Sequence, residues 1–188
     1  TILGQAEGNK MWVVLVACKR DLVERRVGWV RQAGLEPVVG DVDALAVANA
    51  VCAGAADGFS TATRAVINVG MQWTNLAVIK GGHPYLIRDI PWGIEKLSRR
   101  VAEQTGLEER TVVAHLKQSE AVPPAVQDAV AIMCESLTTE LQLSFDFFEN
   151  HFGPPPQQLL VTGGVSQSAS FMEALTRHVP LPVVPWAP

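Results

Sequence analysis

Apolar and polar positions in the first part of the chain predict a strand followed by a helix. Residues 12–17 form a continuous apolar run, which suits a buried strand. The next apolar residues, Val23, Val27 and Val30, recur with helical spacing. Gly34 ends this predicted helix, because glycine adopts the left-handed conformation of a helix C-terminus without steric cost.

The middle of the chain predicts a second helix and then a β-meander. Small alanines fill the predicted helix over residues 44–53, which Asp41 or Asp43 can cap, and they indicate close packing against a neighbouring element. Residues 54–60 then break the pattern. Apolar runs separated by glycine turns predict three strands, over Ala65–Val69, Thr74–Ile79 and Tyr85–Ile90.

The second half predicts three helices and then a strand, a glycine pair, a helix and a last strand. The three helices run from Ile94 to Gly106, through Val112–Leu116, and from Pro123 to Gly153. The two strands cover Gln158–Thr162 and Pro182–Val184. The helix between these strands runs from Ser166 or Ser168 to Arg177. Strands and helices mixed in this order indicate an α/β protein.

Composition narrows the function classes. The 188 residues suffice for one domain or two closely packed lobes. The formal net charge of -4 argues against the basic surface that nucleic-acid binding needs. The three cysteines, Cys18, Cys52 and Cys134, are far apart among apolar neighbours, which predicts buried, reduced thiols and a cytoplasmic location. The longest apolar stretch is too short for a membrane span, so we expect any membrane connection to run through a partner.

The first candidate site is the turn between the first two strands of the meander. Asn68 lies near the end of the predicted strand, Gly70 forms the turn, and Thr74 begins the next strand. Such a turn can present backbone N–H groups to phosphate oxygens, and the threonine hydroxyl adds a further donor. An ordinary β-hairpin explains the same residues.

The second candidate site is the glycine pair Gly163 and Gly164, which follows a predicted strand and opens a predicted helix. The unpaired N–H groups of a helix N-terminus can bind a nucleotide. A plain turn is the alternative, but two glycine turns at strand ends, separated by a helical block, are less readily explained by coincidence. The Gly-Lys-Ser/Thr ending of a P-loop, the Cys-x-x-Cys spacing of a zinc site and the Gly-x-Ser-x-Gly elbow of a hydrolase do not occur in the sequence.

The order of these motifs resembles the PilM family, the actin-like proteins of type IV pilus assembly, whose relatives include FtsA and the cytoplasmic part of the type II secretion L protein. The resemblance covers most of the chain, and it rests on residues 13–20, 33–37, 41–46, 68–74, 88–93, 141–148 and 162–166, with Lys117 where the family has a lysine near the nucleotide base.

This resemblance implies an actin-like, ribonuclease H-like ATPase fold with ATP and magnesium in a cleft between two lobes. It assigns cofactor binding to six residues: Asn68, Gly70, Thr74, Lys117, Gly163 and Gly164. Asn68 stands where the family has an acidic residue, and an amide cannot supply that charge. The first phosphate loop of the family is absent, so we expect a partial chain and a nucleotide-binding or degenerate scaffold rather than an active ATPase.

The resemblance also divides the chain and names a partner. Residues 1–40 correspond to the end of a first-lobe inserted subdomain, 41–60 to a connecting helix, 61–95 to the second-lobe meander, 96–153 to a helical subdomain, and 154–188 to the remaining second-lobe elements. The expected function is a cytoplasmic scaffold that docks the N-terminal peptide of a PilN-like inner-membrane protein and can self-associate. A secretion L-type domain, an FtsA-like division protein and an active actin-like ATPase are the alternatives.

Overall fold

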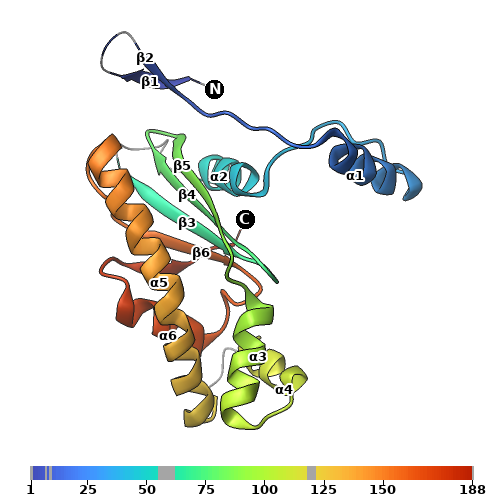
Figure 1. Ribbon diagram of the computed structural model, residues 1–188, viewed down its shortest axis with the longest axis vertical. Helices are drawn as coiled ribbons and strands as arrows, with labels where there is room; N and C mark the ends of the chain where they lie inside the picture. The colour runs from blue at the N-terminus through green and yellow to red at the C-terminus, as the bar shows by residue number, and fades with distance from the viewer. Residues whose placement is uncertain (1, 7, 9, 55–61, 118–121, 188) are drawn as a thin grey trace.

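The computed structural model describes residues 2–6, 8, 10–54, 62–117 and 122–187 (Figure 1). Its strands are β1 (Ile2–Ala6), β2 (Lys10–Val13), β3 (Arg64–Val69), β4 (Thr74–Lys80), β5 (His83–Ile90), β6 (Leu159–Gly163) and β7 (Val183–Pro185). Its helices are α1 (Arg20–Gln32), α2 (Asp43–Gly54), α3 (Ile94–Thr105), α4 (Glu109–Leu116), α5 (Pro124–Phe152) and α6 (Ala169–His178). The predicted break over residues 54–60 lies, from residue 55 on, outside the described residues.

A five-stranded mixed sheet with the order β5-β4-β3-β6-β7 forms the centre of the molecule. The predicted meander is confirmed, since β3, β4 and β5 are consecutive antiparallel neighbours. β6 then runs parallel to β3 on its other side, and β7 runs parallel to β6. Parallel neighbouring strands need a crossover connection. The long helical block between β5 and β6 provides it, so that β6 can pair with β3. The carboxyl ends of β3, β6 and β7 therefore lie at one edge of the sheet.

Helices cover the two faces of this sheet unequally (Figure 1). The main core lies between the sheet and α3, α5 and α6, and it contains Ile67 and Leu76 of the sheet with Leu137, Phe148 and Phe171 of the helices. On the opposite face α2 packs Ala48 and Val51 against the sheet. The small alanines of α2 allow this close approach, as the sequence predicted.

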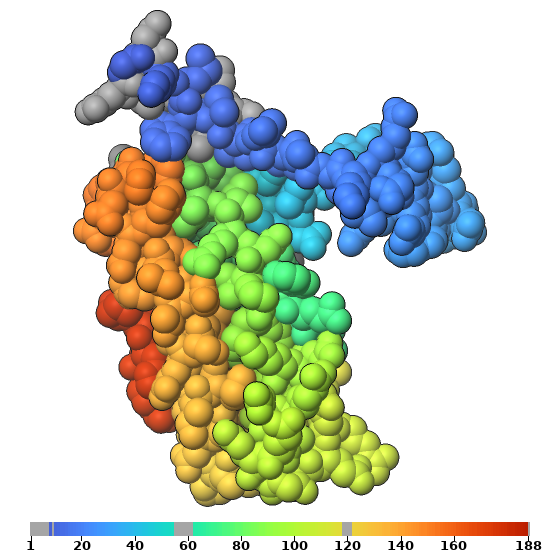
Figure 2. Space-filling model, viewed as in Figure 1, coloured from blue at the N-terminus to red at the C-terminus, as the bar shows by residue number. Residues whose placement is uncertain are grey.

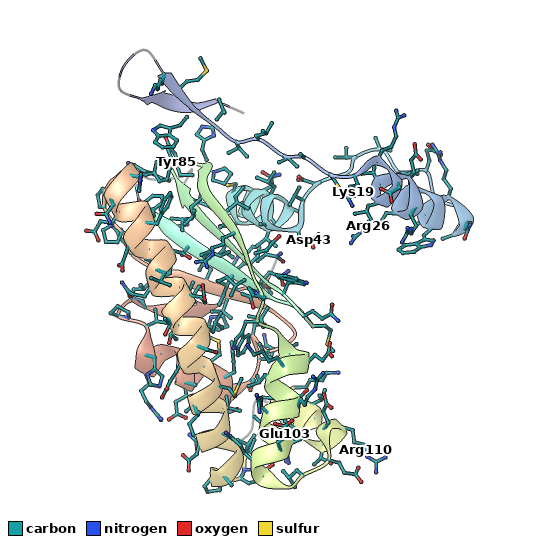
Figure 3. The ribbon with its side chains drawn as sticks, viewed as in Figure 1. Lys19, Arg26, Asp43, Tyr85, Glu103 and Arg110 are labelled. Atoms are coloured by element: carbon teal, nitrogen blue, oxygen red, sulfur yellow. The ribbon has the colours of Figure 1, made fainter. Side chains whose placement is uncertain are left out.

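The long helix α5 is tied to the sheet by two cations. Arg88 of β5 donates to Ser144 Oγ at 2.9 Å and forms an ion pair with Glu140. Lys80 of β4 donates to the Phe152 carbonyl at 2.6 Å, at the last residue of α5, where a cation complements the helix dipole. Tyr85, labelled in Figure 3, packs edge-on against Phe152. These contacts set the direction in which α5 crosses the sheet.

The N-terminal part of the chain differs most from the sequence prediction. The buried strand expected over residues 12–17 is wrong: β2 covers Lys10–Val13, its side chains are exposed, and Leu15 beyond it is also exposed. Helix α1 is confirmed, with Gly34 at a φ of +79° just after its end, but none of its residues is buried. Figure 2 shows α1 projecting from the rest of the molecule. The run is mostly exposed, although Trp12 packs edge-on against Phe152 at the end of α5.

The three cysteines also differ from one another. All are free; Cys134 is buried, Cys52 is half-buried and Cys18 is exposed, which corrects the prediction of a buried thiol for Cys18. Burial raises the pKa of the Cys134 thiol to about 12, so this side chain acts as an apolar core residue. Within the described ranges, no helix is both long and apolar enough to cross a membrane.

Candidate functional site

The two predicted glycine turns lie side by side at the carboxyl ends of β3 and β6. In the parallel register Asn68 is opposite Thr162 and Val69 is opposite Gly163. The structure therefore brings Asn68, Gly70 and Gly163 to one edge of the sheet, although more than ninety residues separate the two turns along the chain. Open α/β sheets bind ligands at this edge, outside the carboxyl ends of the strands.

Asn68 is held by a chain of side-chain hydrogen bonds across the sheet. Its Nδ2 donates to Asn75 Oδ1 of β4 at 3.2 Å, and Asn75 Nδ2 donates to Asp89 Oδ1 of β5 at 2.7 Å. These residues are direct neighbours in the register of the three strands. The side chain of Asn68 is thus positioned by the sheet rather than by a loop.

The β3–β4 turn is rigid because the N-terminus of α3 holds it. The Gly70 N–H donates to the Trp73 carbonyl at 3.0 Å. The Gly70 carbonyl accepts from the Ile94 N–H at 3.0 Å, and the Met71 carbonyl accepts from the Glu95 N–H at 2.9 Å. The Gly70 N–H is therefore engaged within the hairpin, and the role of Gly70 toward phosphate stays a prediction.

Thr74 has a structural role in this fold. Its side chain is fully buried on the helix-covered face of the sheet, and its hydroxyl donates to the Trp92 carbonyl at 2.7 Å. The sequence predicted that this hydroxyl would contact phosphate. The prediction is wrong for the structure, because strand alternation turns Thr74 toward the core while its neighbour Asn75 faces the opposite side.

Gly163 packs directly on the end of β3. It has a φ of +98°, and a Cβ at this position would lie 2.3 Å from the Val69 carbonyl oxygen and 2.9 Å from Asn68 Oδ1. Its own carbonyl accepts from the Ser166 hydroxyl at 2.9 Å. Only glycine fits this position, because both the backbone conformation and the space exclude a side chain.

The glycine pair does not open a helix directly. A turn follows Gly163, and α6 begins only at Ala169, with Ser168 as the N-cap that accepts from the Phe171 N–H at 3.4 Å. Of the two predicted starts, Ser168 is therefore the one observed. In the intervening turn the N–H groups of Ser166 and Ser168 donate to the carbonyls of Gly163 and Val165, and Gly164 is exposed.

Lys117, the residue expected near a nucleotide base, is exposed at the end of α4. Helix α4 packs on α3 and, to a smaller extent, on α6. None of the contacts described for Lys117 joins it to Asn68 or Gly163. Its role toward a nucleotide stays a prediction.

Sequence reasoning missed Asn75 and Asp89. A signal for Asn75 exists, since it is a polar residue inside a strand whose next four residues are all buried and apolar. Asp89 follows the same alternation in β5. Asn68, Asn75 and Asp89 lie side by side only because of the register between β3, β4 and β5. The sequence pattern of each strand by itself does not contain that register.

The polar groups at this edge of the sheet suit a metal-bound nucleotide better than a bare metal ion. In the part of the chain that the structure describes, no three His, Cys, Asp or Glu side chains are grouped to hold a metal. The Asn68 amide offers one neutral oxygen, of the type that magnesium accepts. A Cβ at Gly163 would lie 2.9 Å from this oxygen, so a side chain at this position would crowd it.

The fold is that of actin-like proteins, as the likeness to solved structures shows. MreB5 of Spiroplasma citri bound to ADP has the same fold, with a TM-score of 0.63 at 12% identity over 91% of this chain and 62% of that one. The ethanolamine utilization protein EutJ from Carboxydothermus hydrogenoformans gives a TM-score of 0.58 at 23% identity over 83% of this chain and 53% of that one.

A family model identifies the group within this class. Residues 3–184 match the family described as type IV pilus assembly protein PilM, and the chain belongs to this family. The solved PilM–PilN type IV pilus biogenesis complex contains a similar chain, with a TM-score of 0.70 at 23% identity over 87% of this chain. The match covers 47% of that chain, so the present sequence spans about half its length. A sequence search among curated proteins gives no match.

Proposed function

We propose that this protein is a cytoplasmic, actin-like scaffold of type IV pilus assembly. It docks the N-terminal cytoplasmic peptide of a PilN-like inner-membrane protein, and this partner holds it at the inner membrane. Membership of the PilM family over residues 3–184 is the observation that carries the proposal. The similarity to a chain of the PilM–PilN complex supports a partner of this kind.

An exposed apolar surface near the N-terminus supports docking of the partner peptide by the N-terminal part of the chain. Of the eighteen large apolar side chains exposed in the described part of the chain, twelve lie between residues 11 and 39. They include Trp29 on α1, which is 60% exposed, and Val38 and Val39 after it. Exposed apolar surface on this scale marks an interaction site. In Figure 2 the segment that carries it extends from the body of the molecule.

We expect Trp29→Ala to weaken binding of the PilN-like peptide by about tenfold or more, since exposed tryptophans at interfaces often contribute 2 kcal/mol or more. The measurement is calorimetric titration of a synthetic peptide, with the sequence of the partner's cytoplasmic N-terminus, into the full protein. Trp73→Ala is the matched control, because Trp73 is similarly exposed but lies on the β3–β4 turn. Equal affinity of both variants and the parent would contradict docking at α1.

The second part of the proposal is that ATP binds at the strand-end site without rapid turnover. The neutral amide of Asn68 supports this, because it offers an oxygen to a metal-bound nucleotide but no negative charge to orient an attacking water. An active actin-like ATPase is the competing function. Within this proposal Gly163 and Gly164 lie at the adenosine side, and residues 61–95 and 154–188 form the second lobe.

We expect magnesium ATP to bind the full protein with little phosphate release. Asn68→Asp adds a charge that attracts magnesium but loses the hydrogen bond that Asn68 donates to Asn75, so we expect it to tighten this binding by less than about tenfold. Calorimetric titration measures the affinity, and a phosphate assay measures turnover. Absence of binding in both proteins would remove ATP from the proposal and leave the peptide scaffold. Steady phosphate release by the parent protein would establish the ATPase instead.

A further inference from the structure

A row of polar side chains crosses the face of the sheet on which α2 packs. Asp89, Asn75 and Asn68 are register neighbours on β5, β4 and β3. Two residues back along β3 and two residues onward along β4, on the same face, Val66 and Ala77 are buried beneath α2. The polar row therefore begins where the cover of α2 ends, next to the strand-end site.

The carboxylate at one end of this row sets the orientation of both amides. An ionised carboxylate can only accept hydrogen bonds, so Asn75 must turn its NH₂ group toward Asp89. The Asn75 oxygen then faces β3 and can only accept, so Asn68 must turn its own NH₂ group toward Asn75. The direction of each hydrogen bond follows from the one before it.

This orientation leaves the Asn68 oxygen on the side of β6. Strand β3 lies between β4 and β6, and the Asn68 NH₂ group points toward β4. Its Oδ1 lies 2.9 Å from the position that a Cβ on Gly163 would occupy. The site thus presents a fixed acceptor oxygen on the side of β6, where Gly163 lies close to it and Thr162 is the register partner of Asn68.

We propose that Asp89 is a positioning residue that acts through Asn75 to present the Asn68 oxygen to the ligand. An acceptor oxygen attracts a cation or a hydrogen-bond donor and repels an ionised phosphate oxygen. The row therefore makes the site select a nucleotide whose phosphates carry a divalent cation over the same nucleotide without metal. This inference rests on the proposed binding of ATP at the strand-end site.

Two substitutions test the row in different ways. Asp89→Asn keeps the shape of the side chain but lets it donate, so both amides can reverse and Asn68 can present its NH₂ group to a phosphate. Asn75→Leu keeps the charge and approximate size but breaks the link between Asp89 and Asn68. Asp128→Asn removes the same charge as Asp89→Asn from an exposed position on α5 and serves as the control.

The measurement is the affinity of the full protein for ATP with magnesium and for ATP with a chelator. We expect the parent protein and Asp128→Asn to prefer the magnesium complex, and this preference to fall by about tenfold in both Asp89→Asn and Asn75→Leu, the upper end for one hydrogen bond. The side-chain NH₂ protons of Asn68, followed by NMR without nucleotide, should exchange with solvent faster in both variants.

Each other outcome has a definite meaning. A preference unchanged in Asp89→Asn and Asn75→Leu overturns the positioning role while ATP binding stands. A preference lost in Asp89→Asn and Asp128→Asn, but kept in Asn75→Leu, assigns the effect to net charge and also overturns it. If the parent protein binds neither form of ATP, the nucleotide part of the proposed function fails together with this inference.

Discussion

Gly163→Ala is expected to lower the free energy of unfolding by about 3 kcal/mol or more and to abolish ATP binding. The φ of +98° is a conformation that alanine rarely adopts, and strained residues of this kind cost about 1–3 kcal/mol. The added Cβ would also lie 2.3 Å from the Val69 carbonyl oxygen, so β3 and β6 would have to separate at the site. Overpacking of this kind costs a further 1–3 kcal/mol, roughly.

Urea denaturation of the purified protein measures this loss, and Gly164→Ala provides the matched control. A Cβ at Gly164 would meet only Ile94 Cδ1 at 3.0 Å, which is the flexible end of a side chain. We expect the control to lose less than about 1 kcal/mol, as is usual at exposed positions. Equal losses in the two variants would show that the close approach of β6 to β3 is not what requires glycine here.

Phe148→Ala is expected to destabilise the protein by about 3–5 kcal/mol, the range for removing a buried aromatic ring. Phe148 is fully buried in the main core, and its ring centroid lies 5.5 Å from that of Phe152. Alanine would leave a cavity between α5 and the sheet. The melting temperature should fall by about 10 °C, as expected for a domain of this size.

Phe147→Ala is the control on the same helix, one residue away. Phe147 is 45% exposed and stacks on His151 with a centroid distance of 4.2 Å, so its removal opens no enclosed cavity. We expect a loss of at most about 1 kcal/mol. If the two variants melted at the same temperature, α5 would not pack on the sheet through the face described above.

Much of the candidate site could be predicted because glycines and short motifs carry local information. The strand–glycine junctions and the family resemblance together predict Asn68, Gly163 and Gly164, and the structure brings Asn68 and Gly163 together. The roles of Gly70 and Thr74 could not be predicted in the same way. Their hydrogen bonds to Trp73 and Trp92 depend on how the turn and the chain after β5 fold back on them.

The sequence by itself determined the order and type of the regular elements from β3 onward, since periodicity and turn residues are local properties. Helical spacing alone also defines which side chains of α5 share its buried face. The family resemblance, carried by short motifs spread along the chain, is confirmed by the match over residues 3–184.

Only the tertiary structure decided which residues meet. The apolar run over residues 12–17 has the pattern of a core strand, yet its exposed side chains depend on what packs against it, which no local pattern contains. The row from Asp89 through Asn75 to Asn68 depends on the register of three strands. Strand pairing sets register through contacts between residues far apart in the chain, so hydrogen bonds across the sheet become visible only when the sheet has formed.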